Sequence, residues 1–214
     1  MTEVAFLFAP GAGAPSSSAW MQAFRERLAQ VARTECFDYP YQKAGRRTPD
    51  RHPVLVAAHR SAFEALRATH AGPIVLVGKS MGGRIGCHLA VELGENGPSA
   101  LVCLGYPLVG QRGALRDAVL LELRTPVLFV QGTRDPMCPL LHLAEIRRRM
   151  QAPTELYTVE DGDHSLVVTK GRLKANGTSQ EQIDAEVVAT LATFAKRHSP
   201  TAAHRGPNDT AHHS

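Results

Sequence analysis

The sequence has no apolar run long enough to cross a lipid bilayer, and no basic segment precedes a hydrophobic stretch near its start. The opening letters, MTEVAFLFAPG, instead resemble a short strand followed by a turn. We therefore expect neither a transmembrane helix nor a signal peptide. The sequence predicts a cytoplasmic protein that does not bind membranes.

Closely paired cysteines are also missing. The four cysteines are scattered, and none of them form a C-x-x-C pair: Cys36, Cys87, Cys103 and Cys138. This spacing indicates neither a zinc site nor a redox pair. In a reducing compartment we expect free thiols that fill space in the core. We predict no metal and no cofactor.

A strong charge of one sign is absent as well. The chain has 24 Lys and Arg against 20 Asp and Glu, which gives a net charge of +4 over 214 residues. Basic side chains gather at Arg46, Arg47 and Arg51, and again at residues 147–149. On a helix, three successive side chains point about 100° apart and form no single stripe. This pattern is typical of a solvated surface, so we expect no nucleic-acid partner.

What is present is a regular alternation of strand-like and helix-like segments. Runs such as IVLV, ALVCL and VLFV are apolar at every position, as in strands that are buried on both faces. Expected strands cover residues 4–9, 36–41, 74–77, 100–104, 127–131 and 155–159, and expected helices cover 20–34, 54–68, 82–93, 139–150 and 180–197. The alternation predicts an α/β fold, with a mostly parallel sheet of about six strands and helices on both faces.

The same pattern predicts one domain over residues 1–198. Residues 199–214 have no apolar periodicity and read as a disordered tail. Only about twenty residues separate the strands expected at 100–104 and 127–131, which is too few for an inserted lid domain.

The segment Gly78-Lys79-Ser80-Met81-Gly82 lies between a buried strand and a helix. This G-x-S-x-G pattern, in that setting, is typical of a strained turn that presents a nucleophilic serine hydroxyl above a sheet. A phosphate-binding loop would need glycine where the chain has Pro73. A dinucleotide fingerprint at Gly11 would need glycine where the chain has Ser16.

A serine nucleophile needs a histidine that takes its proton and a carboxylate that orients the histidine. Asp135 follows the strand expected at 127–131, and His164 follows the strand expected at 155–159. Taken alone, Asp135 is equally well interpreted as a turn residue. The order serine, acid, histidine, each just past a strand, favours a triad of Ser80, Asp135 and His164. Asp161 and Asp163 remain alternative acids.

The negative oxygen that forms during attack on a carbonyl needs backbone N–H donors. We expect one from Met81, the residue after the nucleophile, and a second from Ala12, with Gly11 as the hinge of the first loop. The alternative for that loop is a plain strand-to-helix turn.

Substrate contacts are predicted at several positions after strands. Arg46 and Arg47 lie in the loop that follows the second strand, where they would bind a substrate carboxylate or simply face solvent. Gly11 and Tyr106 are further candidates for substrate binding.

These segments resemble compact α/β-hydrolases related to dienelactone hydrolase, and more narrowly the branch grouped with the third regulatory subunit of the nonspecific-lethal acetyltransferase complex. The segments that carry the resemblance are FAPGAGAPSSSAWM, FDYPYQKAGRRTPDRHPVL, LVGKSMGGRIG, LVCLGYPL, PVLFVQGTRDP and DGDHSL. The resemblance implies the α/β-hydrolase fold and a triad at Ser80, Asp135 and His164. Many α/β-hydrolases have His-Gly at the oxyanion loop, where this chain has Pro10-Gly11.

From the residues and the resemblance together we expect a serine hydrolase with an open site. Its substrate would be a small-molecule ester, thioester or lactone, cleaved through an acyl-enzyme. The alternative is a non-catalytic interaction scaffold that keeps a vestigial hydrolase site, because the branch includes members viewed as scaffold subunits.

Overall fold

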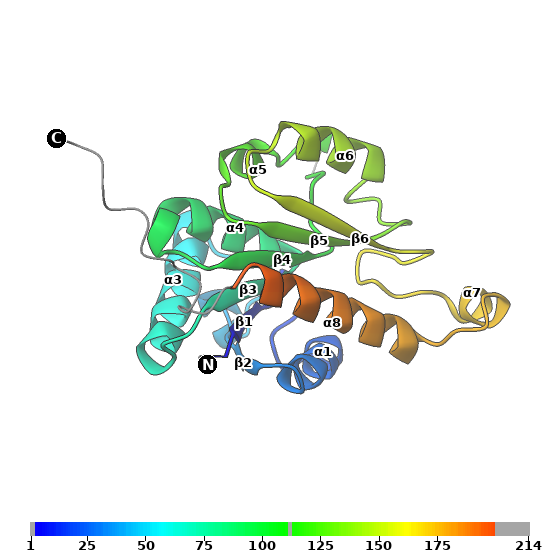
Figure 1. Ribbon diagram of the computed structural model, residues 1–214, viewed down its shortest axis with the longest axis horizontal. Coiled ribbons are helices and arrows are strands. Elements are labelled where there is room, and N and C mark those ends of the chain that lie inside the picture. The colour runs from blue at the N-terminus through cyan, green and yellow to red at the C-terminus, as the bar shows by residue number, and fades with distance from the viewer. Residues whose placement is uncertain (1–2, 111–112, 200–214) are drawn as a thin grey trace.

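The structure is a computed structural model of the chain, and it describes residues 3–110 and 113–199. Within these residues, six strands form one sheet in the order β2-β1-β3-β4-β5-β6 (Figure 1). All five neighbouring pairs of strands are parallel. The strands are β1 (Ala5–Ala9), β2 (Arg33–Cys36), β3 (Ile74–Lys79), β4 (Ala100–Leu104), β5 (Val127–Gly132) and β6 (Thr154–Val159). The predicted α/β class and parallel sheet are confirmed.

Helices cover both faces of this sheet (Figure 1). The core on one face is packed by α3, α4, α5 and α6, and the core on the other face by α1 and α8. The bounds are α1 (Ala19–Ala29), α2 (Pro40–Lys43), α3 (His52–Thr69), α4 (Met81–Leu93), α5 (Ala118–Glu122), α6 (Leu140–Arg149), α7 (Lys170–Ala175) and α8 (Gln180–Arg197), with a 3-10 turn, η1 (Gly94–Asn96).

Strand β1 shows why the sequence is apolar at every position. Ala5 and Leu7 pack into one core, whereas Phe6 and Phe8 pack into the other. Successive side chains of a strand point to opposite faces, so a strand covered on both faces buries all of them. Each buried phenylalanine or leucine contributes about 1.5–3 kcal/mol of transfer free energy.

The order of the strands places the candidate site. The chain runs from β1 outward to the edge strand β2 and then returns to β3 on the other side of β1. Ligands of open parallel sheets bind beyond the carboxyl ends of the strands at the point where this order reverses. Here that point lies between β1 and β3, and the residues that follow these two strands include Ala12 and Ser80.

Several expected bounds are wrong. The helix expected at 20–34 ends at Ala29. The expectation was too long because Val31 and Ala32 continue the apolar spacing of the helix, although the chain has already turned toward β2 there. The strand expected at 36–41 is β2, which ends at Cys36. The next segment is helical from Pro40, because proline suits the first turn of a helix. The short elements α5, α7 and η1 had no sequence signal that we recognised.

The connection from β4 to β5 is short, and its described residues form only α5 and irregular structure. No lid domain is therefore inserted over the sheet at this point. Among the described helices, none combines the length and the apolar character needed to span a membrane. The predicted boundary of the domain at residue 198 stays a prediction, and residues 200–214 of the predicted tail lie outside the described residues.

Candidate active site

Ser80 is the turn residue between β3 and α4. Its φ of 49° and ψ of −113° lie in a region that non-glycine residues rarely adopt. The turn is tight because a Cβ built on Gly78 would lie 2.1 Å from the backbone nitrogen of Gly83, and one built on Gly82 would lie 2.6 Å from the carbonyl oxygen of Ala9. Both glycines of the G-x-S-x-G pattern are therefore required at this turn. Strand β3 continues to Lys79, so a phosphate-binding loop has no room here.

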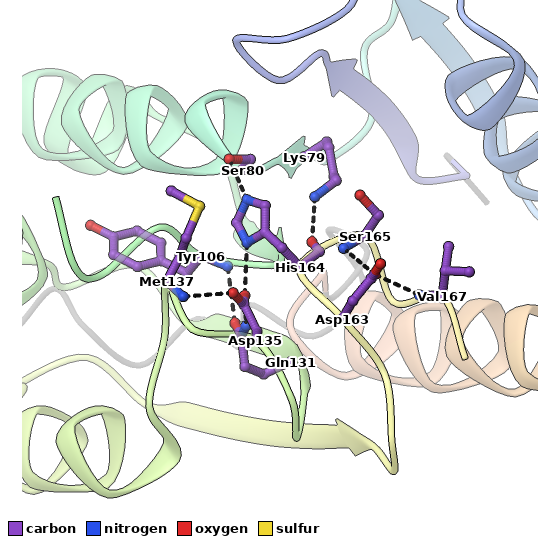
Figure 2. A network of polar contacts seen from close by, with 10 residues as sticks. All are labelled: Lys79, Ser80, Tyr106, Gln131, Asp135, Met137, Asp163, His164, Ser165 and Val167. Carbon is purple, nitrogen blue, oxygen red and sulfur yellow. Dashed lines mark hydrogen bonds and ion pairs between the residues drawn. The ribbon is translucent and has the colours of Figure 1, made fainter. Parts of the chain in front are cut away.

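The structure brings Ser80, His164 and Asp135 together from three separate loops. The Nε2 atom of His164 lies 2.8 Å from the Oγ of Ser80, and its Nδ1 atom lies 2.7 Å from Oδ2 of Asp135 (Figure 2). These are hydrogen-bond distances. A neutral imidazole that donates from Nδ1 to the carboxylate has its Nε2 free to accept the proton of Ser80.

Asp135 is buried, with its side chain fully removed from solvent. The amide of Gln131 donates to its Oδ2, and the backbone N–H of Met137 donates to its Oδ1 over 2.8 Å (Figure 2). Gln131 is in turn fixed because its Oε1 accepts from the backbone N–H of Tyr106 over 3.0 Å. A buried carboxylate with several donors is held in one orientation. Sequence reasoning missed the role of Gln131, because a single glutamine in a buried strand does not indicate which side chain it contacts.

The loop that carries His164 is held at three points. The Nζ of Lys79 donates to the backbone carbonyl of His164, and the indole N–H of Trp20 donates to the carbonyl of Ser165 over 2.9 Å. The carboxylate of Asp163 accepts from the backbone N–H groups of Ser165 and Val167, at 2.7 and 3.0 Å. These contacts position the imidazole through its backbone.

The two alternative acids, Asp161 and Asp163, contact groups other than the imidazole of His164. Asp163 closes the turn just described, and it is not the carboxylate that contacts the imidazole. Asp161 has a φ of 57°, and its carboxylate lies 3.6 Å from the Nε of Arg172. The structure therefore brings Asp135 to His164 and neither of the alternatives.

Lys79 is a buried cation directly before the nucleophile. Burial lowers its pKa to about 8, although the charges of Asp135 and Asp163 act in the opposite direction. Its Nζ also lies 5.5 Å from the centre of the Trp20 ring, which suits a cation. The ammonium group is thus held between the ring and the His164 carbonyl.

The two expected oxyanion donors lie at the carboxyl ends of β1 and β3. Met81 is the first residue of α4, where backbone N–H groups lack intrahelical partners. The carbonyl of Ala12 accepts from the hydroxyl of Tyr41 over 3.1 Å, and that of Gly11 accepts from the amide of Gln42 over 3.0 Å. These bonds fix the carbonyls of the loop toward α2. Within residues 3–110 and 113–199, the N–H groups of Ala12 and Met81 donate to no protein acceptor.

Two pockets meet at Ser80. The first, of about 360 Å³, is lined by Gly11, Trp20, Met21 and His164, among others, and we call it the histidine pocket. The second, of about 610 Å³, is lined by His52, Arg84, Gly110 and Arg116, among others, and we call it the arginine pocket. Ala12, Ser80 and Met137 line both. A substrate at Ser80 therefore has room on two sides.

Of the residues predicted to contact substrate, only Gly11 lines one of these two pockets. Gly11 lines the histidine pocket. Tyr106 does not fit its prediction, because its ring is fully buried against Phe129 and its hydroxyl donates to the backbone carbonyl of Arg116 over 3.0 Å. Arg46 and Arg47 are exposed and line neither pocket, and Arg46 pairs with Asp50 at 2.6 Å. Sequence reasoning missed Arg84 and Arg116, which do line a pocket.

A family model described as an alpha/beta hydrolase domain matches residues 2–196. A protein of Bacillus subtilis, described as uncharacterized protein YqkD, is 31% identical over 67 residues. That match spans 31% of this chain and 22% of the relative, so the chain aligns with about a fifth of that protein's length.

Solved structures share the fold. A dienelactone hydrolase from Anabaena variabilis has a TM-score of 0.71 and 17% identity, over 93% of this chain and 88% of its own. A serine hydrolase from Xanthomonas campestris, described as lacking a lid, has a TM-score of 0.68 and 16% identity, over 92% and 83%. An alpha-beta serine hydrolase homologue from Coxiella burnetii has a TM-score of 0.68 and 17% identity, over 89% and 86%. The narrower resemblance, to the acetyltransferase-complex branch, stays a prediction.

Proposed function

The chain belongs to the alpha/beta hydrolase domain family, and from the geometry at Ser80 we propose that it is a serine hydrolase of a small ester, thioester or lactone. The observation that carries the proposal is the hydrogen-bonded series Ser80–His164–Asp135, with distances of 2.8 and 2.7 Å. These three residues lie beyond the carboxyl ends of the strands, where ligands of open parallel sheets bind.

In the first half of the reaction, the Oγ of Ser80 attacks the carbonyl carbon while Nε2 of His164 takes its proton. The carboxylate of Asp135 stabilises the imidazolium that results. The negative oxygen then accepts from the N–H groups of Ala12 and Met81. Each donor of this kind contributes about 10²–10³ to the rate. The leaving alcohol or thiol takes the proton from His164, and the acyl group stays on Ser80.

In the second half, His164 removes a proton from water, which attacks the acyl group. The carboxylic acid leaves, and Ser80 regains its proton from the imidazolium. The protons balance: the one taken from Ser80 passes through His164 to the leaving alcohol or thiol, and the one taken from water passes through His164 to Ser80.

The substrate is expected to be small. The two pockets at Ser80 measure about 360 and 610 Å³, which suits a small molecule. Only a short connection separates β4 from β5, so no inserted domain would cover a long acyl chain. An open site of this kind favours soluble esters over lipid substrates.

The test is a panel of p-nitrophenyl esters and acyl thioesters with wild type and Ser80→Ala. We expect Ser80→Ala to lower kcat by about 10³-fold or more, because attack by Ser80 is lost. Ser61→Ala, which changes an exposed serine of α3, is the matched control and should retain the wild-type rate. Equal rates for wild type and Ser80→Ala, or no hydrolysis of any ester by folded wild type, would contradict the proposal. The second result would favour the scaffold hypothesis.

A further inference from the structure

Two arginines, Arg84 and Arg116, line the arginine pocket together with the candidate nucleophile Ser80. Arg84 lies four residues after Ser80 in α4, and its backbone N–H donates to the carbonyl of Ser80 over 3.2 Å. Residues four apart share one face of a helix, and helical side chains lean toward the N-terminal end. The Arg84 side chain therefore reaches back along the face of α4 that begins at Ser80.

Arg116 reaches the same pocket from the connection between β4 and β5. Its backbone N–H donates to the carbonyl of Leu108 over 2.8 Å, beside the antiparallel bridge of Val109 and Leu115. A Cβ built on Gly110 would lie 2.8 Å from the Nε of Arg116. The Arg116 side chain thus lies against bare backbone, which only a glycine at position 110 allows without displacing it.

Neither arginine has an acidic partner within residues 3–110 and 113–199. Six other arginines of the described chain each form an ion pair with Asp or Glu: Arg27, Arg33, Arg46, Arg60, Arg172 and Arg197. The one acidic side chain lining the arginine pocket, Asp50, is already engaged by Arg46 at 2.6 Å and by the backbone N–H of Tyr41 at 2.9 Å.

Two polar atoms of this pocket's lining residues are buried with no hydrogen-bond partner in the described chain. They are the Nε of Arg84 and the Nε2 of His52. Burial lowers the pKa of the Arg84 guanidinium, and the charge of Arg116 acts in the same direction. The Arg84 charge also lowers the pKa of His52, second to burial. Groups whose charge is opposed by burial and by a like charge are stabilised when an anion binds between them.

We propose that the arginine pocket binds a carboxylate carried on the acyl part of the substrate, with Arg84 and Arg116 as its ligands. The inference rests on the proposed function, because it names a substrate class for the same site. Guanidinium groups bind carboxylates through paired N–H donors. On an acyl chain, a compact anion that two guanidinium groups can bind is a free carboxylate at the end remote from the ester or thioester.

The side on which the acyl part lies follows from the proton path. The leaving group must reach His164, which lines the histidine pocket and is not among the residues that line the arginine pocket. An alcohol or thiol that leaves from that side places the acyl chain on the opposite side of Ser80. That side is the arginine pocket, so the substrate is an ester or thioester of a dicarboxylic acid.

The kinetic test compares mono-p-nitrophenyl adipate, which has a free carboxylate, with p-nitrophenyl hexanoate, which does not. Uncatalysed hydrolysis is subtracted. We expect the ratio of kcat/KM for adipate over hexanoate to exceed about ten in wild type, and to fall about tenfold or more in Arg84→Leu and in Arg116→Leu, as for loss of a charge-assisted bond. Arg149→Leu, which removes an exposed arginine from the last turn of α6, is the control for net charge and should keep the wild-type ratio.

A binding test separates this inference from the proposed function. Adipate is titrated calorimetrically into Ser80→Ala, and into the same protein with Arg84→Leu or Arg116→Leu added. We expect the dissociation constant to rise about tenfold or more with either arginine removed. If Arg84→Leu does not fold, Arg116→Leu and the wild-type ratio still decide the question.

The outcomes are distinct. Wild type that hydrolyses adipate and hexanoate esters equally well through Ser80 would overturn the carboxylate site and leave the hydrolase standing. Adipate that binds in an arginine-dependent way to a protein that hydrolyses no ester would support the site and overturn the proposed function. Adipate binding that is unchanged in both arginine variants would also overturn the site.

Discussion

The Nζ of Lys79 donates a hydrogen bond to the backbone carbonyl of His164, so the residue before the candidate nucleophile holds the loop of the candidate base (Figure 2). Gly105 packs against the same carbonyl, because a Cβ built there would lie 2.4 Å from the His164 oxygen. The position of the imidazole relative to Ser80 therefore depends on contacts to backbone, not only on the hydrogen bond to Asp135.

Lys79→Met should lower kcat by about tenfold with little change in KM, because the loop of His164 loses a donor that fixes its backbone. Misplacing a catalytic group by about 1 Å can cost up to about 10² in rate. Steady-state kinetics on a short p-nitrophenyl ester measures this. Lys174→Met, which removes an exposed lysine of α7, is the control. Wild-type kcat in Lys79→Met would contradict the assigned positioning role.

The same variant should change how stability depends on pH. Burial lowers the pKa of Lys79 to about 8, whereas an unfolded lysine titrates near 10.4. Between these values the unfolded chain binds more protons at this residue, so its contribution to the free energy of unfolding rises with pH. The stability that Lys79 contributes is thus lost as the pH falls toward and through 8.

Urea unfolding at pH 7.5 and at pH 10 tests the sign. We expect the free energy of unfolding of wild type, relative to Lys79→Met, to increase by about 2 kcal/mol between these two values. Lys174→Met should show no such difference from wild type. A wild-type curve parallel to that of Lys79→Met across this range would mean that the Lys79 ammonium is not destabilised by burial.

Gln131 is expected to position Asp135. Gln131→Leu removes the side-chain donor to the carboxylate and leaves the backbone N–H of Tyr106 without its acceptor. We expect kcat to fall about tenfold with KM nearly constant, since a charge-assisted hydrogen bond is lost away from the substrate. Gln131→Glu keeps the size of the side chain but places a second carboxylate against that of Asp135. We therefore expect kcat at neutral pH to fall further in Gln131→Glu than in Gln131→Leu. Equal kinetics in wild type and Gln131→Leu would exclude a positioning role.

Gly82 tests the tight packing behind Ser80. A Cβ at this position would lie 2.6 and 2.7 Å from the carbonyl oxygens of Ala9 and Pro10, and backbone cannot yield as a side chain can. Gly82→Ala should lower the free energy of unfolding by about 3 kcal/mol, within the range of severe steric changes. Gly171→Ala in α7, where a Cβ meets no atom within 4 Å, should instead be neutral or stabilising by about 0.5 kcal/mol. Similar stability of the two variants in denaturant unfolding would contradict the packing described here.

The sequence predicted the arrangement of Ser80, Asp135 and His164 because each residue lies in the loop after a strand. Ser80 and Asp135 follow the buried strands β3 and β5, and His164 follows the half-buried edge strand β6. Parallel strands bring their carboxyl ends to one edge, so the spacing along the chain does not matter. The bounds of β2 were not predictable in the same way. This edge strand has exposed residues at Arg33 and Glu35, and it lacks the continuous apolar run that marks the central strands.

The polar side chains around these three residues were less accessible to sequence reasoning. The sequence pointed to Arg46 and Arg47 because they follow a strand, yet their loop turns them to solvent. The sequence did not distinguish Arg84 from other polar residues on helices, or Arg116 from other polar residues in loops. Whether a cation lines a pocket depends on where a loop folds back, and no periodicity encodes that.

In the proposed mechanism, His164 activates the Oγ of Ser80. The most direct measurement is labelling of purified protein by a fluorophosphonate probe, in which the oxygen displaces fluoride from phosphorus, followed by peptide mass mapping. We expect a single label on Ser80, no label in Ser80→Ala, and labelling slowed by about 10²-fold or more in His164→Ala, because proton transfer to a base is lost. Folded wild type that stays unlabelled, or a Ser80→Ala variant that is labelled as well as wild type, would contradict activation of Ser80 by His164.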